Sequence, residues 1–289
     1  MTTTVDADEE LRMLASSSSG IHDTNNAKNP FANWWHVTNN AKNPFANWWH
    51  VYIPYCTGDV HAGNQTKDYG ITTIHHRGAV NAQTAMKWAW ANLPKNPDTV
   101  ATVGCSAGSM GSFVNAPYVN HQFPNAKKVH WADSYLGVTT ANQFTQAYQN
   151  WDMQFAPFIP GLDKKSLFPF KFPDTMVQII SASFSFFPGA TTSVYTSNAD
   201  IVQESYFTLG GGNILNWTNL ARAEIAAVEK SAVGKQFTSY VASGGDHCRS
   251  QDDGFYSVSQ NGVKLYEWVT NIAQGTVPNS VDCKPHCGL

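Results

Sequence analysis

The sequence predicts an α/β fold, in which a mostly parallel sheet is flanked by helices. Short runs rich in β-branched residues alternate along the chain with longer segments of helical periodicity. The 289 residues suffice for one large core, and the shares of aromatic and charged residues, 13% each, exclude disorder for most of the chain.

The predicted strands are short apolar or β-branched runs that stop at turn-forming residues. They cover residues 51–54, 71–74, 99–103, 128–132, 193–196 and 237–242. The last four of these strands are each followed by a polar side chain suited to chemistry. These side chains are Ser106, Asp133, Asp200 and His247.

The predicted helices are longer segments with apolar residues at helical spacing. They cover residues 80–93, 107–116, 142–153, 174–186, 217–232 and 263–272. Pro117 is expected to end the second of these helices, because proline has no backbone N–H to continue the hydrogen-bond pattern. Residues 157–173 are rich in proline and phenylalanine and are expected to form an irregular, partly buried insertion.

An exact repeat lies near the start of the chain. Residues 24–37 read TNNAKNPFANWWHV, and residues 38–51 repeat this sequence without a difference. Two copies of a 14-residue unit are too few for a solenoid, so one copy is surplus to the fold. We expect residues 1–38 to be a poorly ordered or duplicated segment and the folded domain to span residues 39–289.

Composition excludes several classes of function. The chain has 18 basic and 21 acidic residues, a net charge of -3 and no basic block, which argues against nucleic-acid binding. Apolar runs stay below the ~18 residues that a membrane helix needs. Uncharged polar residues with many tryptophans and tyrosines suit a secreted protein that meets neutral polymers. The sequons at Asn64 and Asn216 favour secretion, although the acidic start shows no signal-peptide pattern.

The chain has five cysteines: Cys56, Cys105, Cys248, Cys283 and Cys287. An odd number in a secreted protein leaves one outside the disulfides. We expect a disulfide that ties the C-terminal tail to Cys248. A zinc site formed by Cys248, the two tail cysteines and His286 is the alternative, but its spacing matches no zinc signature well.

A nucleophile motif follows the strand predicted at 99–103. Gly104 to Gly108 reads GCSAG and fits G-x-S-x-G, in which a sharp strand-to-helix turn exposes the serine oxygen above a sheet. Ser106 is therefore the candidate nucleophile, and the alternative is a glycine-rich turn without function. A serine hydroxyl is too weakly acidic to attack unaided and needs a base.

His247 is the candidate base, because it follows the last predicted strand in the glycine-rich loop SGGDHC. The acid that orients it must lie between Ser106 and His247 in the chain and beyond a strand. Asp200 fits best, and Asp133 is its rival, with the capping of a turn as the other role open to Asp133. The expected order is serine, aspartate, histidine.

Six motifs occur in order and together carry a family resemblance. They are YIPYCTGDVHAGN (52–64), HHRG (75–78), GCSAGS (104–109), ADS (132–134), TSNADIVQ (196–203) and DHC (246–248). The chain resembles the pectin acetylesterase family, which also includes the Notum-type carboxylesterases. The resemblance implies an α/β-hydrolase-like fold, secretion, and removal of O-acyl groups, often acetyl from pectin. It implies Ser106 as nucleophile, Asp200 as acid and His247 as base.

The start of the chain departs from this family. The family normally has an upstream Gly-Gly-Gly-Trp/Ala-Cys segment whose backbone N–H groups help to form the oxyanion hole. Nothing similar precedes Tyr52, so the N-terminal part of the fold is expected to be incomplete, and only the Ala107 N–H is assigned to the oxyanion hole. In the TGDVHAG loop, Asp59 and His61 are possible pocket-lining residues, with a turn-capping role equally open for Asp59.

These observations predict a monomeric serine carboxylic ester hydrolase that acts through an acyl-enzyme on an acylated polysaccharide and needs no metal or organic cofactor. One alternative is a catalytically inactive relative that only binds glycan. The other is a lipid-ester hydrolase, in which the phenylalanine-rich residues 155–187 line an acyl-chain pocket. Ordinary core packing is the other reading of that stretch.

Overall fold

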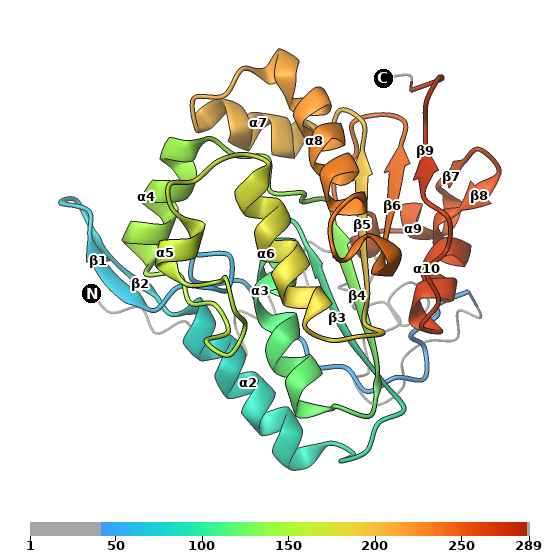
Figure 1. Ribbon diagram of the computed structural model, residues 1–289, viewed down its shortest axis with the longest axis horizontal. Coiled ribbons are helices and arrows are strands. Elements are labelled where there is room, and N and C mark those ends of the chain that lie inside the picture. Colours follow the sequence, from blue (N-terminus) through green and yellow to red (C-terminus); the bar gives the residue numbers. More distant parts are fainter. Residues whose placement is uncertain (1–41, 288–289) are drawn as a thin grey trace.

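A central parallel sheet organises the computed structural model, which describes residues 42–287 (Figure 1). Its strands, in spatial order, are β3 (Thr99–Cys105), β4 (Lys127–Asp133), β5 (Thr191–Ser197), β6 (Phe237–Ala242) and β9 (Val281–Asp282). All neighbouring strands in this sheet run parallel. The predicted α/β class is therefore confirmed, while residues 1–38 and the whole first copy of the repeat lie outside the described residues.

Helices connect the strands and cover the sheet. They are α2 (Gly78–Asn92), α3 (Ala107–Gln122), α4 (Ala141–Trp151), α5 (Lys164–Leu167), α6 (Asp174–Ser185), α7 (Ile201–Leu209), α8 (Ile214–Glu229), α9 (Gly254–Ser257) and α10 (Leu265–Ala273). Two antiparallel pairs lie outside this sheet: β1 (Gln65–Asp68) with β2 (Thr73–His76), and β7 (Ser259–Gln260) with β8 (Val263–Lys264). Two short 3₁₀ helices, η2 (Gly234–Gln236) and η3 (Arg249–Gln251), complete the described elements. No helix in the described part of the chain is both long and apolar enough to span a membrane.

Two hydrophobic clusters lie on opposite faces of the sheet, because alternate side chains of a strand point to opposite sides. In β4, Trp131 belongs to the cluster that also contains residues of α9 and α10. The next residue, Ala132, belongs to the larger cluster that contains residues of α3, α6 and α8. The central strands are thus buried on both faces, as in other parallel sheets.

The phenylalanine-rich residues 155–187 supply this larger core. Phe170, Phe184 and Phe187 are buried in it, and Phe170 stacks on Phe144 with ring centroids 4.4 Å apart. Of the whole stretch, only Met176 lines the cavity described below. The ordinary core reading of these aromatic residues therefore holds.

Several predicted elements differ from the structure. Residues 51–54 are not a strand, and Val51 and Tyr52 are exposed rather than buried. Pro117 does not end α3, which continues to Gln122; buried side chains on both sides of the proline hold the helix together by packing. The strand expected at 71–74 is displaced by two residues in the structure, where β2 spans Thr73–His76 and pairs only with β1, apart from the central sheet.

The disulfides also differ from the prediction. Cys105 is bonded to Cys248, and Cys283 is bonded to Cys287. The expected link between the tail and Cys248 is therefore wrong. The alternative zinc site is wrong as well, since the sulfur atoms that it requires are consumed in these two bonds.

Glu224 on α8 is an unusual buried acid and leads to a stability prediction. Its side chain is 1% exposed, and neither carboxylate oxygen has a hydrogen-bond partner among the described residues. Burial raises the pKa of Glu224 well above its ordinary value of 4.5, so folding favours the protonated form. This contribution to stability is complete below pH 4.5 and is lost as the pH rises through the folded-state pKa.

We therefore expect Glu224→Gln to stabilise the protein more at pH 8 than at pH 5, with a difference on the order of 1–3 kcal/mol. Urea unfolding at both pH values measures this difference. Glu229→Gln, at an exposed position of the same helix, is the matched control and should show no such pH dependence. An equal effect of Glu224→Gln at both pH values would contradict the prediction.

Candidate active site

The carboxyl ends of four adjacent strands carry the candidate residues. Ser106 follows β3, Asp133 ends β4, Asp200 lies beyond β5, and His247 lies in the loop after β6. Parallel strands present their carboxyl ends at one edge of the sheet, which is where α/β proteins bind ligands. The topology therefore gathers residues that are up to 141 positions apart in sequence.

Ser106 occupies a strained turn between β3 and α3. Its φ of 55° and ψ of -122° are rare for a residue with a side chain, and such strain is typical of functional sites. Gly104 makes the turn possible, because a Cβ there would lie 1.9 Å from the carbonyl oxygen of Gly108. Gly108 has no such constraint, because a Cβ added there would have no neighbouring atom within 4 Å. Gly108 lines the cavity.

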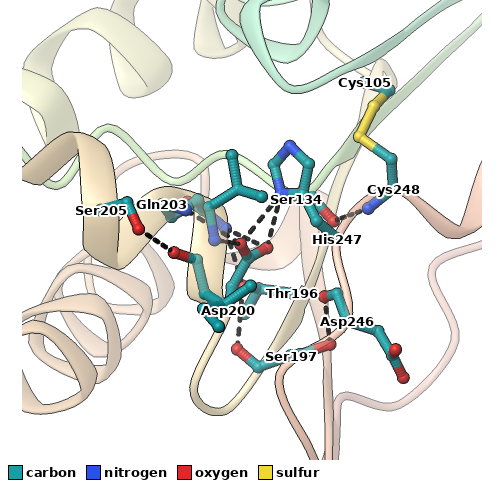
Figure 2. A network of polar contacts seen from close by, with 12 residues as sticks. Cys105, Ser134, Thr196, Ser197, Asp200, Gln203, Ser205, Asp246, His247 and Cys248 are labelled. Carbon is teal, nitrogen blue, oxygen red and sulfur yellow. Dashed lines mark hydrogen bonds and ion pairs between the residues drawn. A yellow bond between two sulfur atoms is a disulfide. The ribbon is translucent and has the colours of Figure 1, made fainter.

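Asp200 and His247 form the polar centre of the site (Figure 2). His247 Nδ1 lies 2.9 Å from both carboxylate oxygens of Asp200, whose side chain is fully buried. An ionised carboxylate only accepts hydrogen bonds, so Nδ1 is the donor and Nε2 remains available as a base. The contact thus sets the imidazole tautomer that a serine hydrolase requires.

The fold holds Asp200 in place from several sides. Asp200 is the N-cap of α7, and its Oδ1 accepts hydrogen bonds from the backbone N–H groups of Val202 (3.1 Å) and Gln203 (3.0 Å). Gln203 Nε2 donates to the other carboxylate oxygen at 2.9 Å and to Thr196 Oγ1 at 3.1 Å. Gln203 was not predicted as a site residue, although its position three residues after an N-cap aspartate is typical of a capping box.

Ser106 and His247 line one cavity of about 1780 Å³, without a hydrogen bond between them in this structure. Nucleophile–base hydrogen bonds are often long in unliganded enzymes and shorten when substrate binds. Buried apolar side chains also line the cavity: Met110, Val138, Phe144, Met153, Met176 and Phe207. The cavity therefore combines a small polar centre with an extended apolar wall.

Ala107 is the first residue of α3 and lines the same cavity. The first N–H groups of a helix have no acceptor within the helix, and the helix dipole gives them partial positive charge. The Ala107 N–H is therefore placed where a helix end can stabilise a negative oxygen.

Asp133, the rival acid, does not contact His247. Its buried carboxylate accepts hydrogen bonds from Ser134 Oγ at 2.9 Å, from Ser250 N at 2.6 Å and from Ser250 Oγ at 2.5 Å. Burial raises the pKa of Asp133, while these donors oppose the rise. Its contacts thus join the end of β4 to the segment that follows His247.

Asp59 and His61 both belong to the TGDVHAG loop but have different surroundings. His61 lines the cavity, packs on Tyr55 with ring centroids 4.9 Å apart, and has a pKa that burial lowers, which favours the neutral imidazole. Asp59 is not among the lining residues. It is fully buried and accepts hydrogen bonds from Thr57 Oγ1 at 2.5 Å and from the backbone N–H of Gly78, the first residue of α2, at 2.7 Å.

Comparison with known proteins identifies a family and a similar fold. A pectinacetylesterase family model matches residues 9–216. The structure is similar to that of the Wnt deacylase Notum from Drosophila, with a TM-score of 0.60 and 13% sequence identity over 94% of this chain and 77% of that chain. That likeness shows the α/β-hydrolase-like fold. No curated protein matches the sequence significantly. Because the family model covers more than half of its length, the chain belongs to the pectinacetylesterase family, a family of carboxylic ester deacylases.

Proposed function

We propose that this protein is a serine esterase that removes O-acetyl groups from a polysaccharide such as pectin through an acyl-enzyme. The observation that carries the proposal is the Asp200–His247 contact, which leaves Nε2 of the imidazole available beside the cavity that Ser106 lines. Family membership supports the choice of an acyl ester as substrate.

The mechanism divides ester cleavage into two steps. In the first, Ser106 Oγ attacks the carbonyl carbon while His247 Nε2 takes the serine proton, and the imidazolium then gives this proton to the departing sugar hydroxyl. In the second, His247 removes a proton from water, the water oxygen attacks the acyl-enzyme, and the proton returns to Ser106. The Ala107 N–H donates to the oxyanion in both steps, and one such donor is worth about 10²–10³-fold in rate.

Secretion belongs to the same proposal. Asn64 and Asn216, the asparagines of the two sequons, are exposed, so an oligosaccharide transferase has access to them. Expression in a secretory host followed by glycosidase treatment and mass measurement tests this part. Loss of glycan from both positions is the expected result, and an unmodified secreted chain would contradict it.

Hydrolysis of a longer acyl ester is the second candidate function. The apolar wall formed by Met110, Phe144, Phe207 and their neighbours favours it, because a fatty acyl chain buries apolar surface there. The fold shared with a protein named as a Wnt deacylase gives this candidate further support.

The two candidates are separated by rates on acetylated pectin, acetylated xylan, 4-nitrophenyl acetate and 4-nitrophenyl palmitate. We expect acetate release from a polysaccharide, and we expect acetate to exceed palmitate among the small esters. Preference for palmitate would favour the lipid-ester candidate. If the protein hydrolyses none of the four substrates in a way that depends on Ser106, both candidates are rejected. Retained binding to pectin in that case would identify a glycan-binding protein.

A further inference from the structure

One disulfide joins the two turns that carry the proposed nucleophile and base. Cys105 directly precedes Ser106, and Cys248 directly follows His247. The bond spans 143 residues of sequence, with the two Cα atoms 5.7 Å apart. A covalent link at these positions limits how far the two turns can move relative to each other.

The disulfide lies against the imidazole itself. The two sulfur atoms and a ring nitrogen of His247 all lie within 4.8 Å of one another, and Cys248 is buried (Figure 2). The backbone N–H of Cys248 donates to Ser134 Oγ at 2.8 Å, which in turn donates to Asp133. A displacement of Cys248 would therefore move the neighbouring histidine directly.

The loop around His247 has little regular structure to hold it. Residues 243–248 are neither helix nor strand, and Gly244 has a φ of 91°. Hydrogen bonds tie the loop at several points: the carbonyls of Gly244 and Gly245 accept from the backbone N–H groups of Ala199 and Ile201. The carbonyl of Asp246 accepts from Ser197 Oγ at 2.7 Å, and Ser250 donates to Asp133. Such hydrogen bonds can break and re-form one at a time, whereas the disulfide is a covalent connection between this loop and the β3–α3 turn.

We propose that the Cys105–Cys248 disulfide is a positioning element that holds His247 over Ser106, so that its reduction lowers ester hydrolysis in a folded protein. The effect on hydrolysis rests on the proposed esterase function, whereas the effect on His247 placement does not. A misplacement of about 1 Å in a catalytic group lowers rates by about 10²-fold. We therefore expect kcat to fall about 10- to 100-fold, with KM within about twofold of the wild-type value.

Two kinds of perturbation remove the bond. The variant Cys105→Ser/Cys248→Ser lacks it permanently. A water-soluble phosphine removes it reversibly: the phosphine supplies two electrons to the S–S bond, takes the oxygen of water to become a phosphine oxide, and the two water protons complete two thiols. Because two thiols beside an imidazole can bind a metal ion, the buffer contains a chelator. Cys283→Ser/Cys287→Ser is the matched control, since it removes the other disulfide.

The test has a readout that does not need catalysis. A low-field proton resonance reports the hydrogen bond from His247 Nδ1 to Asp200, and its loss in His247→Ala assigns it. We expect this resonance and kcat for 4-nitrophenyl acetate to be altered in Cys105→Ser/Cys248→Ser and in phosphine-treated wild type. Both should be unchanged in the control, and oxidised glutathione should restore them after reduction. Far-ultraviolet circular dichroism should stay native throughout.

An unchanged resonance and kcat in the folded Cys105→Ser/Cys248→Ser variant would overturn the proposal. Global unfolding of both the substituted and the reduced chain would also overturn it, because the bond would then serve folding rather than the placement of His247. If the wild type shows the resonance but no hydrolysis that depends on Ser106, the esterase function fails, while the resonance still decides whether the disulfide positions His247.

Discussion

Ser106→Ala is expected to lower kcat for ester hydrolysis by about 10⁵–10⁶-fold, as loss of the nucleophile does in a serine protease. The turn between β3 and α3 presents the Ser106 hydroxyl at the cavity that His247 also lines, so the variant lacks the attacking group. Alanine fits the same backbone, so the fold should persist. Steady-state rates on 4-nitrophenyl acetate and acetylated pectin, with circular dichroism on each sample, measure the effect.

Ser205→Ala is the matched control for this experiment. Ser205 lies on α7 close to the site, is exposed, and donates only to the carbonyl of Ile201 four residues earlier. Its removal should leave kcat within about twofold, because a surface hydroxyl of this kind takes no part in the chemistry. Retention of more than a few per cent of wild-type activity in Ser106→Ala would mean that another group attacks the ester.

Asp200→Asn is expected to lower kcat by about 10⁴-fold, as the equivalent change in a serine protease does. The carboxylate fixes the proton on Nδ1 of His247 at 2.9 Å, and an amide can present its NH₂ group to that nitrogen and reverse the tautomer. Asparagine is as good an N-cap as aspartate, so α7 should remain intact. The pH–rate profile and kcat of the purified variant measure the change.

Asp133→Asn separates the two candidate acids. Asp133 contacts Ser134 and Ser250 but not His247, so an asparagine there should cost at most about tenfold. The structure thus predicts that Asp200→Asn is far more damaging than Asp133→Asn. The reverse order would show that Asp133 orients the base in solution.

The sequence predicts the central strands well because they are short β-branched runs with clear ends. The strand expected at 237–242 coincides with β6, and the helix expected at 174–186 differs from α6 by one residue. Local signals fail where tertiary contacts decide. Pro117 continues a helix because its neighbours are buried, and residues 51–54 are apolar but remain partly exposed in an irregular segment.

The features of the candidate site also fall into those that local sequence patterns predict and those that depend on tertiary contacts. Ser106 and His247 follow strands and carry motif patterns, so the sequence alone singles them out, and it favours Asp200 as the acid while leaving Asp133 as the rival. The Cys105–Cys248 bond connects segments 143 residues apart, and no local pattern specifies which cysteines pair. The sequence also could not show that His61 lines the cavity while Asp59 does not, because this difference depends on the contact between Asp59 and the start of α2.

The proposed esterase function requires Ser106 to be a nucleophile that His247 activates. The most direct test is to label the wild type and the His247→Ala variant with a fluorophosphonate, which loses fluoride to an activated serine, and to map the modified peptide by mass spectrometry. We expect one label on Ser106 in the wild type, and labelling that is slower by orders of magnitude in the His247→Ala variant. Ester hydrolysis by a protein that is not labelled at Ser106, or a label on another serine, would contradict it.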